Sequence, residues 1–185
     1  MGERAASTAA TRRRILDAAL ELNAELWYDE ITLKLIAERA GVSLQTVVNH
    51  FGTKRGVGEA MLEEQAQGRL ARPDAEPDDV AGAIDILVAN YEDVGDAVIR
   101  ALALELRIPS MRRFLDGGRD DHRRWVERAF PSALAGLRGD ARVRRLDLLV
   151  CATDVYTWKL LRRDRKLSEL ETRDAIRELV EALHR

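Results

Sequence analysis

Helical periodicity runs through nearly the whole chain and most constrains its fold. Apolar residues recur every three or four positions in almost every segment, while alternating runs of β-branched and aromatic residues are missing. The expected fold class is therefore all-α. The pattern predicts helices at about 12–27, 33–40, 44–50, 53–69, 80–92, 94–107, 111–130, 140–163 and 168–184. The helix at 111–130 is weakened at Gly117-Gly118.

Two segments fall outside the helical pattern. Residues 1–10 are small and polar, and we expect them to form a disordered arm. The stretch ARPDAEPDD at 71–79 holds two prolines and four acidic residues, which cannot continue a helix. It marks a linker or an inter-domain loop.

Composition places the chain in the cytoplasm. The net charge of −2 and the isoelectric point near 6.0 exclude a polyelectrolyte. The single cysteine, Cys151, excludes an intramolecular disulfide framework and fits a reducing compartment. Its apolar helix predicts an inert small hydrophobic residue, with a redox-sensing role as the alternative. The N-terminus lacks the apolar core of a signal peptide, and no stretch reaches the ~18 apolar residues of a membrane span.

The last two helices predict an interface with a second copy of the chain. LDLLVCATDVYTWKLL at 146–161 is apolar around nearly its whole circumference, so it needs cover on both sides. The final helix opens with SELE, where Ser168 and Glu171 have capping-box spacing. Nothing follows this helix in the sequence to cover a second apolar surface. We therefore expect a homodimer through residues 140–163 and 168–184.

The helices at 33–40 and 44–50, joined by Gly-Val-Ser, have the layout of a helix-turn-helix. With residues about 100° apart and Val47 inward, Leu44, His50 and Phe51 fall near the inner face, whereas Gln45 and Asn49 point outward. Such an amide ridge suits a DNA major groove. A plain helical corner with a solvated outer face stays open, because residues 1–55 hold only eight Arg and Lys against seven Asp and Glu.

A resemblance favours DNA. The stretch TRRRILDAALELNAELWYDEITLKLIAERAGVSLQTVVNHFGTKRGVGEAMLEE at 11–64 resembles the DNA-binding domain of the TetR family of transcriptional repressors, with ILDAALEL, IAERAGVS and HF in matching places. The resemblance implies a three-helix helix-turn-helix domain at 11–55. A connecting helix then leads to a larger helical domain, 56–185, that binds an effector and dimerises. It also implies a homodimer on a palindromic operator in double-stranded DNA, released by a small molecule.

Outward geometry and the resemblance together predict one DNA-contacting set: Thr32, Ser43, Leu44, Gln45, Thr46, Asn49, His50 and Lys54. Most of these would touch phosphates, and Gln45 would touch a base. The sequence departs from the family at Val48, where a tyrosine is common, and Asn49 is a partial substitute. It departs again at Asn23 and Trp27, where an aromatic side chain has moved along one helix face.

The effector site is predicted more loosely. Apolar pocket walls suit a largely hydrophobic ligand, although ordinary core or dimer packing explains each residue equally well. The candidates are Tyr91, Met111, Phe114, Trp125, Tyr156 and Trp158. Gly56 and Gly58, at the start of the fourth helix, predict either close packing against the first helix or a flexible hinge that transmits the ligand signal.

Other constellations carry little. The three histidines lie far apart without ligand spacing, so we expect no metal and no cofactor. RDDHRRW at 119–125 is interpreted as a solvated charged face rather than an acid–histidine dyad. There is no Gly-rich phosphate loop and no nucleophile elbow, so no enzyme is expected. An activator, a ligand-independent DNA-binding protein and, less favoured, a helical enzyme stay open as alternatives.

Overall fold

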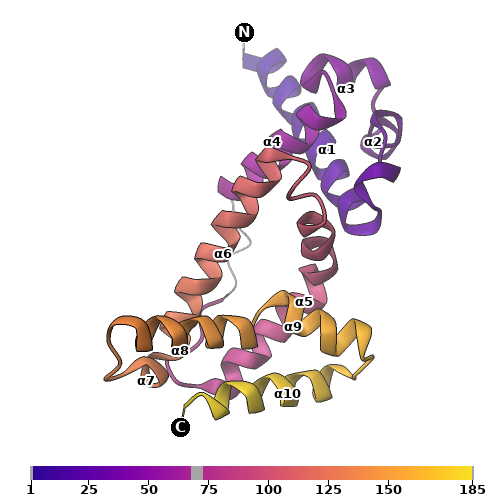
Figure 1. Cartoon of the computed structure of the whole chain (residues 1–185). Helices are drawn as coiled ribbons and strands as arrows, with labels where there is room; N and C mark the ends of the chain where they lie inside the picture. Colours follow the sequence, from indigo (N-terminus) through magenta and orange to yellow (C-terminus); the bar gives the residue numbers. More distant parts are fainter. Residues whose placement is uncertain (1, 68–72, 185) are drawn as a thin grey trace. The chain divides into compact units, whose positions relative to one another are not determined.

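The computed structural model describes residues 2–67 and 73–184, and this part of the chain contains helices without any β-strand (Figure 1). The all-α prediction is confirmed. The chain forms two compact units, the first from residues 1–70 and 100–114, the second from 71–99 and 115–185. This division groups the fourth helix with the first three. The predicted functional boundary at residue 55 stays a prediction.

The first unit is a small bundle around one apolar core. Its helices are α1 (Gly2–Glu25), the 3-10 turn η1 (Tyr28–Glu30), α2 (Leu33–Ala40), α3 (Leu44–Phe51) and α4 (Lys54–Gln67). Helix α1 packs against α2 and α4, and α3 packs against α2 and α4. Ile15, Leu22, Ile36, Val47 and Val57 fill the core. Helix α3 is too short to be stable alone, so burial of these side chains supplies most of the free energy that stabilises it.

Local chemistry fixes the ends of α2 and α3. The Thr32 hydroxyl accepts a hydrogen bond from the Leu35 amide at 3.1 Å, which starts α2. Gly41 ends it with a φ of 65°, a left-handed conformation that glycine adopts without strain. Ser43 then caps α3 through the Thr46 amide at 3.1 Å. Both helices therefore lie where the sequence predicts them, α3 ending one residue later at Phe51.

Helix α1 differs from its prediction at both ends. It begins at Gly2 rather than near Arg12. The expectation of a disordered arm at 1–10 is therefore wrong. Alanine has the highest helix propensity, and neither glycine nor proline interrupts residues 3–11. The helix ends at Glu25, and Trp27 lies beyond it with 55% of its surface exposed. Asn23 and Trp27 therefore share no helix face, and the predicted exchange of aromatic bulk between them is wrong.

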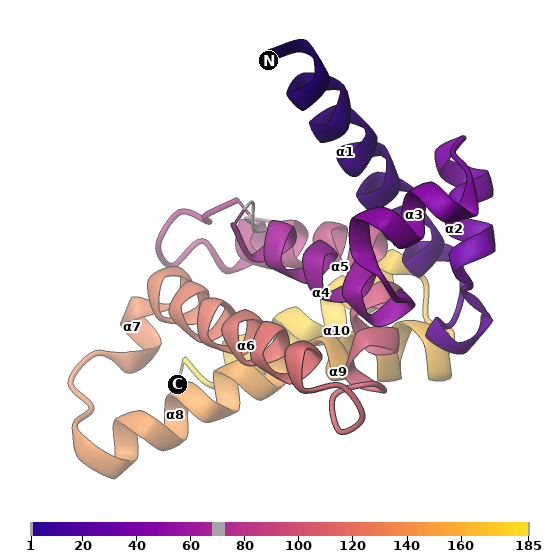
Figure 2. The ribbon, with the colours of Figure 1, turned by 90° about the horizontal axis from the view of Figure 1, so that it is seen from above.

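The second unit contains the remaining helices (Figure 2). They are α5 (Val80–Leu102) and α6 (Pro109–Ala129), both shared with the first unit, then α7 (Pro131–Leu134), α8 (Gly139–Ala152), α9 (Val155–Lys159), the π-helical turn η2 (Leu160–Asp164) and α10 (Glu169–Ala182). The break expected near residue 93 is wrong, because α5 runs through it. Gly117 and Gly118 do not interrupt α6.

The long helix predicted at 140–163 is broken at Thr153 and Asp154. The Asp154 carboxylate accepts a hydrogen bond from the Tyr156 amide at 2.8 Å and so caps a new helix, α9. Aspartate bonds the backbone in this way at the expense of the helix that precedes it. Desolvation by burial raises the pKa of Asp154. The capping box of α10 is confirmed, with Ser168 accepting from the Glu171 amide at 3.2 Å.

Trp158 of α9 lies at the centre of the second unit. It is fully buried, and its ring nitrogen donates to the Glu92 carboxylate at 2.9 Å. The Tyr91 ring packs at 5.8 Å between centroids. A Cβ built on Gly95 would lie 2.6 Å from the Trp158 ring. Only a glycine in α5 therefore lets the indole approach this closely.

Candidate nucleic-acid interface

Helix α3 presents one face to solvent and buries the opposite one. Val47 is fully buried, whereas Gln45, Val48 and Asn49 are exposed. The Gln45 amide nitrogen donates to the Asn49 amide oxygen at 2.8 Å, one helical turn away. This bond uses a donor of Gln45 and the acceptor of Asn49. It leaves the Gln45 oxygen and the Asn49 NH2 group to face outward on adjacent turns.

The N-terminal end of α3 is a second polar feature. The Ser43 and Thr46 hydroxyls lie 2.8 Å apart, in addition to the Ser43 cap on the Thr46 amide. Amide groups in the first turn of a helix attract anions such as phosphate. Thr32 is likewise exposed at the start of α2, where its hydroxyl acts as the cap.

Leu44 lies differently from the helical-wheel estimate, whereas His50 does not contradict it. Leu44 is the first residue of α3 and is 46% exposed, so its assignment to the inner face is wrong. At a helix end, the neighbouring helices do not cover the whole inner side. His50 is half-buried, with its ring centroid 5.9 Å from that of Phe51. The Arg12 guanidinium lies over the Phe51 ring, 5.4 Å from the ring centroid.

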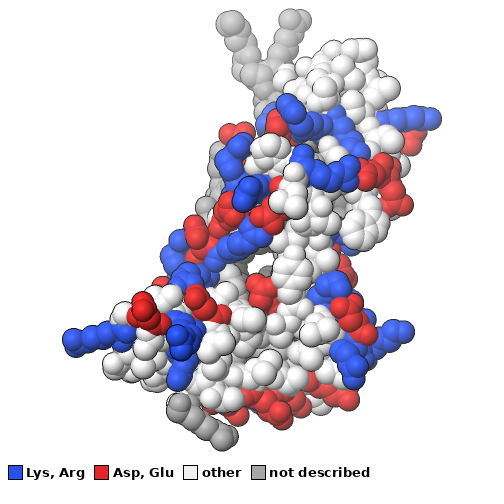
Figure 3. All heavy atoms as spheres, in the orientation of Figure 1, with Lys and Arg blue, Asp and Glu red and all other residues white. Residues whose placement is uncertain are grey.

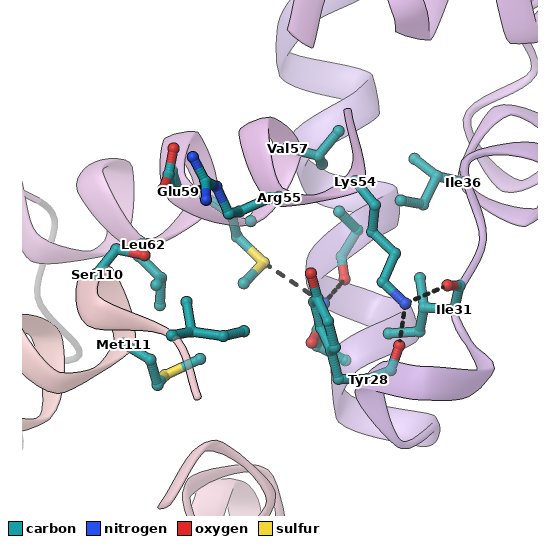
Figure 4. Close-up of a pocket in the computed structure, with 15 residues that line it drawn as sticks. Tyr28, Ile31, Ile36, Lys54, Arg55, Val57, Glu59, Leu62, Ser110 and Met111 are labelled. Carbon is teal, nitrogen blue, oxygen red and sulfur yellow. Dashed lines mark hydrogen bonds and ion pairs between the residues drawn. The ribbon is translucent and has the colours of Figure 1, made fainter. Parts of the chain in front are cut away.

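Lys54 turns inward at the start of α4 (Figure 4). Its ammonium donates to the Ile31 carbonyl at 2.7 Å and to the Tyr28 carbonyl. It also lies 4.0 Å from the centroid of the Tyr28 ring. Desolvation by burial lowers the pKa of Lys54. The Lys54 ammonium therefore has partners within the protein. The phosphate contact expected of Lys54 stays a prediction.

The other basic side chains of the first unit are largely paired. Arg13 forms ion pairs with Glu64 at 2.9 Å and with Asp17 at 3.0 Å. Arg39 bonds Glu25 at 2.8 Å and thereby lowers the pKa of that carboxyl group. Basic and acidic atoms are interspersed over the face shown in Figure 3. The interface thus offers polar recognition with few unpaired cations.

The six candidate effector residues are divided between the two units. Tyr91, Trp125 and Trp158 are buried in the second unit, whereas Tyr156 is 56% exposed. Met111 and Phe114 belong to the first unit, where Met111 lines a cavity of about 20 Å³, room for one water molecule. The assignment of these six residues to an effector pocket stays a prediction.

Sequence reasoning missed a buried polar cluster in the second unit. His122 is only 7% exposed, so the solvated face predicted for residues 119–125 is wrong at this position. Its Nε2 atom lies 3.1 Å from the hydroxyl of Thr153, a fully buried residue. The Tyr91 hydroxyl donates to the Thr153 carbonyl at 3.0 Å. The Thr-Asp break in the apolar run at 146–161 was the signal available in the sequence.

Cys151 is exposed, and its predicted inertness stays a prediction. In a single chain, α8 is covered along one side only, so part of its apolar surface faces outward. Within residues 2–67 and 73–184, no three His, Cys, Asp or Glu side chains converge as metal ligands. Every helix in the same ranges is too short or too polar to cross a membrane.

Known proteins resemble both parts of this architecture. Residues 15–61 match the model of the family described as bacterial regulatory proteins, tetR family. The uncharacterized HTH-type transcriptional regulator YvkB of Bacillus subtilis is 42% identical over 59 residues, 32% of this chain and 31% of that protein. The HTH-type transcriptional regulator AlkX of Mycobacterium tuberculosis is 36% identical over 87 residues, 46% and 37% of the two chains. The matches thus span about a third of these relatives.

Two solved structures share the fold across most of the chain. NalD, the secondary repressor of the MexAB-OprM multidrug efflux pump in Pseudomonas aeruginosa, has a TM-score of 0.52, 20% identity, and coverage of 95% of this chain and 96% of its own. The flavonoid-responsive regulator FrrA also has a TM-score of 0.52 and 20% identity, with coverage of 95% and 93%. Residues 15–61 thus carry a helix-turn-helix similar to that of the tetR family of bacterial regulatory proteins.

Proposed function

We propose that the chain is a cytoplasmic transcriptional repressor that binds a palindromic operator in double-stranded DNA as a homodimer. A small, largely hydrophobic effector releases it. The carrying observation is the exposed pair of Gln45 and Asn49 on α3, joined at 2.8 Å. Its outward oxygen and NH2 group match the N6 donor and N7 acceptor that adenine shows in the major groove.

The proposed DNA surface surrounds this pair. Gln45 and Asn49 read base edges, while the others contact the backbone or the groove wall. These others are Thr32, Ser43, Leu44, Thr46 and His50, all exposed or half-buried. Ser43 places the amide end of α3 against a phosphate. This assignment lets a unit with few unpaired cations bind DNA by hydrogen bonding and shape, and it predicts a modest salt dependence.

The dimer is proposed through α8, α9 and α10. These helices and the turn η2 expose six large apolar side chains, each at least 47% accessible: Val143, Leu148, Tyr156, Leu160, Leu170 and Leu179. A second copy related by a two-fold axis would cover the same surface on both chains. It would also bury the exposed side of α8 that carries Cys151. A two-fold dimer reads two inverted half-sites, which is why the operator is expected to be palindromic.

The effector site is proposed within the second unit, beside the buried aromatic residues Tyr91, Trp125 and Trp158. Their apolar surroundings favour a hydrophobic ligand. The Tyr91 hydroxyl and His122, both bonded to Thr153, are the polar groups that such a ligand would displace or engage.

The test begins with selection of a binding sequence from a random DNA library. Gln45→Ala and Asn49→Ala are then compared with wild type on the selected duplex and on random duplex DNA. We expect each change to cost about 1–3 kcal/mol on the selected sequence and little on random DNA. Glu178→Ala, at an exposed position of α10, is the matched control and leaves both affinities unchanged.

Two results would contradict the proposal. An unchanged ratio of specific to random affinity in both variants would show that the outward pair reads no bases. Footprints that protect one non-symmetric half-site only would exclude the two-fold arrangement.

A further inference from the structure

Two aliphatic side chains are exposed on the outer side of α3, beside the amide side chains of Gln45 and Asn49. Leu44 is 46% exposed and Val48 is 36% exposed. They are four residues apart, so they lie on adjacent turns of one helix face. Leu44 and Val48 form an aliphatic pair next to the amide pair, Gln45 and Asn49, which are bonded to each other at 2.8 Å. The outer side of α3 is therefore partly apolar.

The aliphatic pair lies on one flank of the amide pair. Successive residues are about 100° apart around the helix axis, and Val47 is fully buried, so the amide pair points most directly outward. Val48 then lies about 80° to one side of this direction. Thr46 lies about 80° to the other side, and its hydroxyl is 2.8 Å from that of Ser43. One flank of α3 thus carries hydrocarbon and the other carries hydroxyl groups.

The major groove of DNA offers one kind of apolar group to such a flank. The base edges present nitrogen and oxygen donors and acceptors, together with the C5-methyl group of thymine. Leucine and valine have no hydrogen-bonding group in the side chain, so the aliphatic pair can bond neither a phosphate nor a polar base edge. Contact with thymine methyl groups is therefore the favourable interaction open to this pair.

The amide pair brings α3 close to such a methyl group. Its outward oxygen and NH2 group match the N6 donor and N7 acceptor of adenine. In an A·T pair the thymine O4 atom and C5-methyl group follow these two groups across the groove. A flank of α3 therefore lies beside the methyl group of the same base pair or of the next one. Burial of a methyl group against hydrocarbon is favourable, whereas a hydroxyl group in that place would lose its hydrogen bonds with water, so the aliphatic flank suits the methyl group.

We propose that Leu44 and Val48 determine operator specificity by packing against thymine C5-methyl groups beside the adenine that Gln45 and Asn49 bond. The inference rests on the proposed function and names the base chemistry that each half-site must present, namely adenine with a neighbouring thymine methyl group. Withdrawal of one methyl group from this contact reduces affinity about fourfold, which is the cost of transferring one such group to water.

The test uses the duplex that the wild-type protein selects from a random DNA library. Each thymine of this duplex is replaced in turn by uracil, which pairs with adenine in the same way and lacks only the C5-methyl group. Affinity is measured at one fixed salt concentration. We expect a loss of about fourfold at one or more thymines in each half-site, and no loss at thymines outside the half-sites.

A double variant, Leu44→Ala with Val48→Ala, ties this loss to the aliphatic pair. Both positions are exposed and alanine favours a helix, so the variant should fold. It should bind the thymine duplex more weakly than wild type. Uracil should then cost it less than about twofold at every thymine, because the methyl group has already lost its partner. Leu20→Ala, which shortens a leucine of similar exposure on α1, is the matched control and keeps the wild-type response to uracil.

Two results would overturn this inference alone and leave the proposed function standing. Wild-type affinity that is unchanged by uracil at every thymine would show that no methyl group is read. An equal loss in wild type and in the double variant would assign the methyl contact to other residues. A wild-type protein that selects no sequence would overturn the proposed function, and the inference with it.

Discussion

Gly56 and Gly58, two positions apart near the start of α4, should respond to alanine with opposite signs. A Cβ on Gly56 would lie 2.1 Å from the carbonyl oxygen of Phe51, a backbone atom at the end of α3. A Cβ on Gly58 would meet no atom within 4 Å. Alanine is preferred to glycine in a helix by about 0.5–1 kcal/mol. Gly58→Ala should therefore stabilise the protein by about that amount.

At Gly56 the same gain is outweighed by the clash. The Phe51 carbonyl cannot rotate away as a side chain can, so the α3–α4 junction must move apart. Overpacking of this kind costs about 1–3 kcal/mol, and the Val57 core contact on the next residue shifts with it. Gly56 is thus closely packed against Phe51 at the end of α3, and not against the first helix as the sequence predicted. Gly58 has space around it and does not require glycine for packing.

The assay is urea unfolding followed by circular dichroism at 222 nm, with the two single variants and wild type measured together. Equal slopes in urea are required before midpoints are compared. The expected order of midpoints is Gly58→Ala, wild type, then Gly56→Ala. A Gly56→Ala protein as stable as Gly58→Ala would refute the argument, because it would show that the Phe51 carbonyl tolerates a methyl group.

Two further predictions concern the second unit. Gly95→Ala places a methyl group 2.6 Å from the Trp158 ring, so it should destabilise by about 1–3 kcal/mol and red-shift tryptophan fluorescence; an unchanged spectrum and midpoint would contradict the packing. Hydrogen bonds from the Ser168 side chain and, second, the Ser168 amide lower the pKa of Glu171. The ionised carboxylate therefore stabilises the protein fully above the ordinary pKa of 4.5, and this contribution is lost as the pH falls through the lower pKa of the folded state. Melting of wild type and Glu171→Gln between pH 7 and 3 should converge at acid pH, and a constant difference would exclude the linkage.

The features that sequence predicts best are those decided by neighbouring residues. Thr32, Ser43 and Ser168 cap their helices as expected, because each hydroxyl bonds an amide three positions away. The outward position of Gln45 and Asn49 follows from helical geometry alone once Val47 is buried. Such predictions need no knowledge of the tertiary structure, and this is why they agree with it.

Predictions fail where local preferences compete closely. The arm at residues 1–10 is small and polar, which suggested disorder, yet its alanines favour the helix observed from Gly2. Asp154 sits in a continuous apolar run that suggested one helix, yet its carboxylate caps a second one. In both places composition pointed one way and backbone hydrogen bonding the other. Hydrophobic periodicity reflects side-chain burial only, so it does not report the hydrogen bonds that the backbone forms.

Long basic side chains set a further limit, and it bears directly on the candidate site. The position of Lys54 in the sequence predicts a cation beside α3. The backbone of Lys54 does lie next to the end of α3. Its ammonium nevertheless reaches the Tyr28 and Ile31 carbonyls, because a four-carbon stem allows it to select among partners several ångströms apart. Short side chains such as Ser43 have no such choice. The sequence therefore predicts which face of α3 is exposed more securely than where the charged ends of nearby basic side chains lie.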